Sequence, residues 1–119
     1  RRGVDSRETG KRGEALVADY LLGRGYDILQ WQYRCRYGEI DLVARQGDTL
    51  CFVEVKTRRN LSVAQPREYV TGKKRDKLRA AAAWYLSESG WEGPARFDVA
   101  EVLWERGRPL RIRYIENAF

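Results

Sequence analysis

Histidine is absent from this 119-residue sequence. Its absence excludes Ser-His-Asp and Cys-His catalysis, histidine-ligated zinc, and nucleases that use a histidine base. Cysteine is scarce as well, because Cys35 and Cys51 are too few for a disulfide framework and form no C-x-x-C motif. Acid–base or metal chemistry in this chain must therefore rely on carboxylates, lysines and tyrosines.

Long apolar runs are also missing. None approaches the roughly 20 residues that a membrane-spanning helix needs. The polar residues 1–12 show no secretory signal, and residues 1–8 are expected to be flexible. We therefore expect a cytoplasmic protein with reduced thiols and no membrane partner. The length fits a single domain over residues 1–119 that buries a core without disulfides.

Positive charge is in excess. The chain has 23 Lys and Arg against 17 Asp and Glu, a net charge of +6. Such a balance favours an anionic partner, most commonly nucleic acid. Between Lys56 and Arg79, nine basic residues face two acidic ones. We expect phosphate contacts from this segment, although an ordinary solvated helix face would look similar. The candidates are Arg58, Arg59, Lys73, Lys74 and Lys77.

The hydrophobic pattern predicts an α/β fold. The expected order is αβββαββ, with a mixed central sheet flanked by helices. The buried stripe of the first helix is expected to contain Ala15, Val17, Ala18, Leu21 and Leu22. The expected elements are a helix at 9–23 capped by Thr9, strands at 26–34, 39–45 and 49–56, a loop at 57–70, a helix at 71–87, and strands at 95–104 and 110–115.

Acidic residues interrupt two of the apolar strands. Asp41 lies six positions before Gly47 in the intervening turn, and Glu54 lies seven positions after it. The two carboxylates can therefore lie close together, provided that the strand register places them on one face. Neighbouring carboxylates repel, and a divalent cation is the usual remedy.

Mg²⁺ suits such a site because it takes about six oxygen ligands, several of them water. Asp41, Glu54 and the carbonyl of Val55 are the predicted protein ligands, and Mn²⁺ is a candidate substitute. Lys56 shares a strand face with Glu54 and could orient an attacking water or stabilise charge on a phosphate. A Glu-x-Lys pair is common on solvated strands. The apolar neighbours Leu50 to Val53 favour the functional interpretation here.

An ordered set of motifs spans residues 10–102: G-E-A at 13–15, G-E-I-D-L-V-A at 38–44, F-V-E-V-K-T-R at 52–58, a lysine-rich helix start, and R-F-D-V at 96–99. This set resembles the YraN-type family of small uncharacterised bacterial proteins. That family has a predicted Holliday junction resolvase-like fold, and G-x-I-D followed by E-V-K resembles the core of the PD-(D/E)xK nuclease superfamily. The resemblance implies a restriction-endonuclease-like core. The proline that gives the superfamily its name is replaced by Ile40.

The resemblance also implies roles for single residues. Asp41 and Glu54 match the metal-binding acids, and Lys56 matches the catalytic lysine. Glu14 matches a glutamate that supports the metal site, with a solvent-facing helix charge as the alternative. Asp98, in R-F-D-V, is expected to make a structural hydrogen bond or an ion pair with an arginine.

Together these features predict a Mg²⁺-dependent endonuclease that hydrolyses phosphodiester bonds in DNA, with branched or junction DNA as one candidate substrate. A four-way junction would favour a homodimer with two active sites. The alternative function is a catalytically inactive module that binds nucleic acid or a partner on a nuclease fold.

Overall fold

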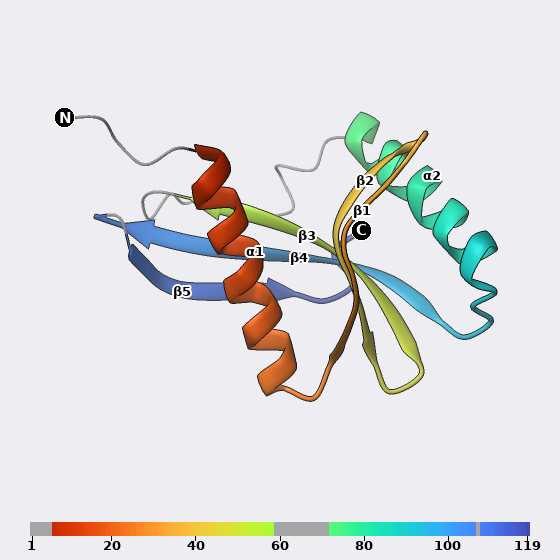
Figure 1. Ribbon diagram of the computed structural model, residues 1–119, viewed down its shortest axis with the longest axis horizontal. Helices are drawn as coiled ribbons and strands as arrows, with labels where there is room; N and C mark the ends of the chain where they lie inside the picture. Colours follow the sequence, from red (N-terminus) through yellow and green to blue (C-terminus); the bar gives the residue numbers. More distant parts are fainter. Residues whose placement is uncertain (1–5, 59–71, 107) are drawn as a thin grey trace.

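The computed structural model describes residues 6–58, 72–106 and 108–119, without the side chains of residues 6–9 and 110. The element order αβββαββ and the mixed sheet between helices are as the sequence predicted (Figure 1). The elements are α1 (Ser6–Gly23), β1 (Asp27–Cys35), β2 (Gly38–Gln46), β3 (Thr49–Arg58), α2 (Gly72–Ser89), β4 (Ala95–Glu105) and β5 (Arg108–Ile115).

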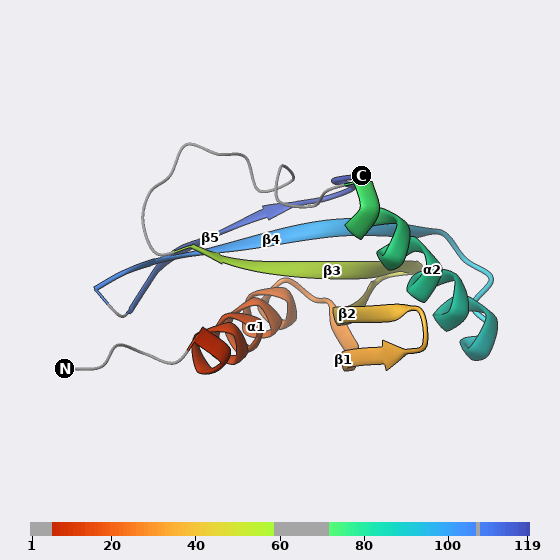
Figure 2. The ribbon, with the colours of Figure 1, turned by 90° about the horizontal axis from the view of Figure 1, so that it is seen from above.

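The five strands form one sheet in the order β1-β2-β3-β4-β5. The β1–β2, β2–β3 and β4–β5 pairs are antiparallel, whereas β3 and β4 are parallel. A parallel pair needs a crossover connection, and α2 lies in this one. Figure 2 shows α1 on one face of the sheet and α2 at one end of the other face.

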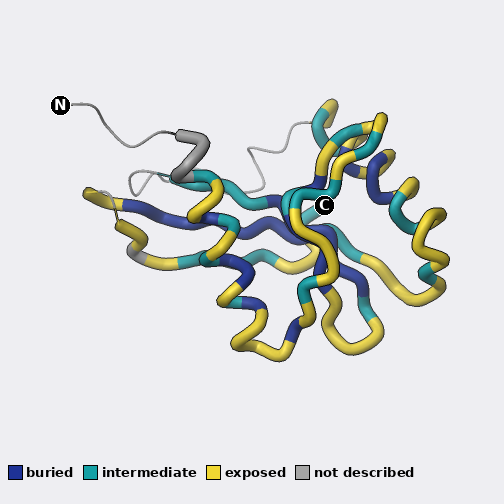
Figure 3. Tube along the Cα trace, in the orientation of Figure 1, coloured by how far each residue is buried: buried dark blue, intermediate teal, exposed yellow. Residues whose placement is uncertain are grey.

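Each helix covers its own half of the core. Val17, Ala18 and Leu21 of α1 pack on Cys51 and Val53 of β3. On the other face, α2 packs on the alternate residues of the same strand; this cluster contains Leu50, Phe52, Leu78, Ala81 and Ala82. The buried stretches of Figure 3 follow the central strands. The predicted alternation of β3 is therefore confirmed, with Glu54 on the face that carries α2.

Some details of the first helix were predicted wrongly. The helix begins at Ser6, so Thr9 does not cap it and residues 6–8 are not an unstructured tail. Ala15 and Leu22 are exposed, because the buried face of α1 lies on the side that carries Gly13, Leu16 and Tyr20. The helix ends in a turn in which Gly25 has a φ of 87°, and Tyr26 N–H donates to the Leu21 carbonyl at 3.0 Å.

The other boundaries agree to within a few residues. Thr57 and Arg58 continue β3 instead of starting a loop, and β5 begins at Arg108. The remainder of the predicted 57–70 loop, with residues 1–5, lies outside the described residues. Among the described helices, none is long and apolar enough to cross a membrane.

The expectation for Asp98 is confirmed. Its side chain is fully buried and accepts bonds from Arg96 Nε at 3.0 Å and from the Asn117 main-chain N–H at 2.8 Å. The Tyr114 hydroxyl donates to it as well. This network ties β4 to β5 and to the C-terminal segment, and it has a structural role.

Candidate active site

The regular alternation of side chains along β2 is interrupted at Asp41. Residues 40 and 42 would share a face in a regular strand. Instead, Ile40 packs in the cluster under α2, and Leu42 packs in the cluster under α1. Residues Leu42 to Gln46 of β2 pair with β3, so the ladder ends at Leu42 and Asp41 is the first residue beyond it. The separation of the two strands at this point makes room for side chains between them.

Asp41 and Glu54 meet at this separation. The register Leu42↔Val53 places Asp41 opposite Glu54 when it is continued by one step. The Asp41 carboxylate accepts a hydrogen bond from the Val55 main-chain N–H at 2.8 Å. That donor would otherwise serve a carbonyl of β2, so the side chain replaces a ladder bond. The register that sequence alone could not fix therefore brings the two acids together.

Burial and the neighbouring Glu54 strongly perturb the carboxyl group of Asp41. Glu54 is only 6% exposed. Burial, followed by the charge of Glu54 and a hydrogen bond with it, raises the pKa of Asp41 to about 8, against the smaller effect of the Val55 N–H. Asp41 can therefore hold a proton at neutral pH unless a cation compensates the pair.

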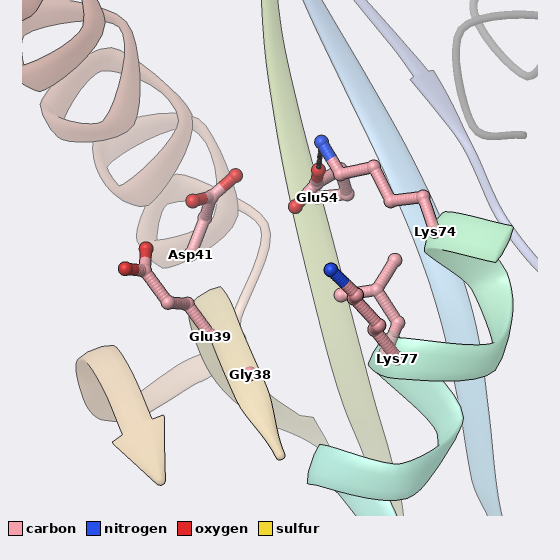
Figure 4. Close-up of a pocket in the computed structure, with 7 residues that line it drawn as sticks. Gly38, Glu39, Asp41, Glu54, Lys74 and Lys77 are labelled. Atoms are coloured by element: carbon pink, nitrogen blue, oxygen red, sulfur yellow. Dashed lines mark ion pairs between the residues drawn. The ribbon is translucent and has the colours of Figure 1, made fainter. Parts of the chain in front are cut away.

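Two lysines reach the Glu54 carboxylate from different elements (Figure 4 shows Lys74). Lys74, in the first turn of α2, forms an ion pair with Glu54 Oε2, and Lys56 Nζ lies 3.5 Å from the same oxygen. Burial and the neighbouring Lys74 lower the pKa of Lys56. Burial lowers the pKa of Lys74, but the hydrogen bonds with Glu54 and Lys56 and the nearby carboxylates together outweigh burial and raise this pKa. Lys56 is therefore the lysine that gives up a proton more readily.

The site opens into a cleft of about 310 Å³ between β2, β3 and the start of α2 (Figure 4). Gly38 forms one wall, where a Cβ would lie 3.6 Å from the Lys77 main-chain carbonyl. The tip of the β1–β2 hairpin thus closes on α2. Five of the seven lining residues have ionisable side chains; the lining consists of Gly38, Glu39, Asp41, Glu54, Lys74, Lys77 and Leu78.

Glu14 approaches the acids from α1, on the other side of the hairpin. Its Oε1 accepts a hydrogen bond from Gln32 Nε2 at 2.9 Å. Burial raises the pKa of Glu14, and the charge of Glu54 adds to the rise. Glu14 is thus half-buried, but it lines a neighbouring hollow and not the cleft itself. A role in supporting the site stays a prediction.

Gln32 was missed by the sequence analysis. It has a φ of 46°, a conformation that costs a residue with a Cβ about 1–3 kcal/mol. It follows Trp31, which pairs with Leu42, and therefore stands across from Asp41. The strained residue therefore lies beside the irregular part of β2, and its side chain is hydrogen-bonded to Glu14. The sequence carried no signal for it, because Gln32 fits the alternation of polar residues with Leu29, Trp31 and Tyr33.

The predicted phosphate-binding residues separate into two groups. Lys74 and Lys77 line the cleft, and Lys73 is exposed in the same turn of α2. Arg58 lies further along β3, where its guanidinium is 3.5 Å from the buried Glu101 carboxylate. Arg59 lies outside the described residues. The basic residues of α2 are therefore beside the acids, whereas Arg58 has a structural partner.

The donor set fits a divalent cation that brings water as further ligands. Among the described residues, no three acidic or cysteine side chains converge as a ready-made metal cluster. Asp41 and Glu54 would supply one carboxylate each. Val55 N–H points at Asp41, and in a β-strand the carbonyl of a residue points to the same side as its N–H. Two carboxylates, one carbonyl and water match the way Mg²⁺ is held in proteins.

The fold and the acids beside lysines define an α/β domain of the order αβββαββ with a candidate active site at the end of the β2–β3 ladder. Residues 13–102 match the uncharacterised protein family UPF0102. The chain belongs to this family, which confirms the resemblance drawn from its motifs.

Proteins similar to this chain occur in diverse bacteria. A UPF0102 protein of Geotalea uraniireducens is 41% identical over 117 residues, covering 98% of this chain and 92% of that protein. One from Symbiobacterium thermophilum is 46% identical and covers 96% and 98%. The solved structure of Pyrococcus furiosus SfsA in complex with Ca²⁺ has a TM-score of 0.39 and 15% identity, covering 95% of this chain and 64% of that one.

Proposed function

We propose that the protein is a divalent-metal-dependent endonuclease that hydrolyses phosphodiester bonds in DNA. The observation that carries the proposal is the pairing of Asp41 with Glu54 at the end of the β2–β3 ladder, with Lys56 and Lys74 on the same carboxylate. Mutual repulsion and burial of the two carboxyl groups lower the stability of the folded protein, so the arrangement is not explained by folding. Groups with perturbed pKa values in a cleft are typical of functional sites.

Each residue has a distinct task in the proposed reaction. Asp41, Glu54 and the Val55 carbonyl would hold Mg²⁺ or Mn²⁺, which supplies Lewis-acid polarisation of the phosphate and a more acidic water. Lys56 lies beside Glu54 with a lowered pKa, so it can position the attacking water and exchange a proton with it. Lys74 and Lys77 would contact the phosphate and limit the build-up of negative charge.

The surroundings of the cleft support an extended anionic substrate. Lys73 is exposed in the same helical turn as Lys74, and Lys77 follows one turn later. These side chains form a basic rim on one side of the acids. Phosphate contacts of this kind provide affinity that does not depend on sequence and that falls with salt.

A cleavage assay tests the proposal. Labelled junction, flap, single-stranded and duplex DNA would be incubated with Mg²⁺ or Mn²⁺ and the parent, Asp41→Asn or Lys56→Ala. We expect cleavage by the parent alone, with losses of at least about 100-fold in both variants. Glu39→Gln is the matched control, because Glu39 lines the same cleft but is exposed and paired with Arg34.

Unchanged cleavage in both variants would refute the assignment of the site. An absence of cleavage by the parent, together with salt-sensitive DNA binding, would favour the alternative function of a catalytically inactive binding module.

A further inference from the structure

A second hollow adjoins the acids on the α1 side of the hairpin. It is lined by Lys11, Glu14, Trp31 and Gln32 and has a volume of about 280 Å³. Gln32 links the hollow to the acids, because it stands across from Asp41 in the β1–β2 pairing and donates to Glu14. A strand of DNA with a phosphate at Asp41 and Glu54 could therefore reach this hollow with a neighbouring nucleotide.

Trp31 presents an indole ring in this hollow. The residue is 49% exposed, although it lies on the sheet face that α1 covers, opposite the buried Leu42. Tryptophan is usually well buried in folded proteins. An exposed tryptophan beside a candidate active site therefore needs an explanation other than core packing.

The backbone is irregular on both sides of Trp31. The β1–β2 register shifts between Ile28 and Gln30, and Gln32 has a φ of 46°. Bulges at sheet edges near active sites commonly redirect a side chain. Here the two irregularities place the Trp31 ring beside α1 and turn the Gln32 amide onto Glu14.

We propose that the Trp31 hollow is a subsite for an unpaired nucleobase of the DNA strand that is cut. The base would stack on the indole, while Lys11 would contact a flanking phosphate and the Gln32 amide and Glu14 carboxylate would face the base edge. A base inside a duplex has both faces covered by its neighbours, so the subsite selects single-stranded, flapped or open junction DNA over regular duplex. This inference rests on the proposed function, since it takes DNA as the ligand.

A binding experiment isolates stacking from charge. Affinity would be measured by fluorescence anisotropy in the Asp41→Asn background, using a short labelled oligothymidine, an abasic strand of equal length, and a duplex. We expect Trp31→Ala to weaken oligothymidine binding by about 5- to 100-fold, the usual effect of losing one aromatic stacking partner. Binding of the abasic strand and of the duplex should stay unchanged.

Two further variants serve as controls. Trp31→Phe should retain most of the affinity, because it keeps an aromatic face. Leu29→Ala, which removes an exposed apolar side chain from the same strand, should have no effect.

Three results would overturn the subsite: no loss in Trp31→Ala, an equal loss on the abasic strand, or a dimer that depends on Trp31 in sedimentation. The cleavage assay separates this failure from failure of the proposed function. If the parent cleaves DNA and Trp31→Ala has no effect on binding, the subsite proposal alone is refuted. If the parent binds bases through Trp31 but does not cleave DNA with any metal, the nuclease proposal alone is refuted. If the parent neither binds nor cleaves DNA, both proposals are refuted.

Discussion

Replacing Asp41 by asparagine should make the protein more stable while abolishing the proposed cleavage. The free aspartate has a pKa near 3.8, and in the folded protein its pKa is about 8. Between these values the folded state holds a proton that the unfolded state has released. Stability therefore falls as the pH rises from about 4 to about 8. Asparagine has no proton to release and escapes this loss.

The magnitude follows from the two pKa values. At pH 7 the unfolded aspartate lies about 3 pH units above its pKa, which corresponds to roughly 4 kcal/mol as an upper bound. Relaxation around the site reduces this figure, so we expect a gain of about 1–4 kcal/mol. The amide can still accept the Val55 N–H bond and can donate to Glu54, so the packing is kept. A gain of this size raises Tm by at least about 4 °C.

Thermal and urea unfolding with a chelator would measure the difference between parent and variant. The difference should be small at pH 4, where both side chains are neutral, and should reach its maximum near pH 8. Asp19→Asn, at an exposed position on α1, is the control and should change stability little at either pH. A destabilised Asp41→Asn protein, or a difference independent of pH, would refute the reasoning about the paired carboxyl groups.

Three shorter predictions follow. Mn²⁺ should raise the Tm of the parent but not that of Asp41→Asn, and equal shifts would place the cation elsewhere. Gly13→Ala should cost about 1–3 kcal/mol in urea unfolding, because its Cβ would lie 2.8 Å from Thr57 Oγ1, and adding Thr57→Ala should restore most of the loss. Asp98→Asn should cost about 3–5 kcal/mol by removing the buried carboxylate that binds the partly buried Arg96, and a loss below about 1 kcal/mol would contradict this.

The core of the fold could be predicted because its signals are local. Glycine at position 47 marks the β2–β3 turn and has a φ of 60°, and strict alternation along β3 separates the two core clusters. The turn and the alternation made Asp41 and Glu54 candidate neighbours. Whether they share a face depended on the strand register, which the pairing of Leu42 with Val53 in the structure establishes. The position of the buried face of α1 was not predictable, because it depends on how the helix lies against the sheet.

The parts of the site that the sequence did not predict depend on long-range packing. Gln32 contacts Glu14 only because the β1–β2 hairpin is irregular at this point. The positive φ of Gln32 has no local sequence signal. Lys74 looked like one member of a basic patch. Its contact with Glu54 depends on the placement of α2 against the end of the β2–β3 ladder. Side chains brought together by strand divergence and helix docking need three-dimensional information.

The charge balance of the site implies a coupling between cation binding and protonation. Lys56 and Lys74 both contact Glu54, whereas Asp41 has a main-chain N–H and a raised pKa in place of a lysine. A cation held by both carboxylates must therefore displace the proton of Asp41 and compete with Lys74 for Glu54. Since ligands bind metal in their deprotonated form, the apparent affinity for Mn²⁺ should increase with pH up to about 8 and then level off. Lys74→Met would remove the competing ammonium, so its titration curve should lie at lower Mn²⁺ concentration. Loss of that charge also raises the pKa of Asp41, so the increase in affinity should extend to higher pH than in the parent.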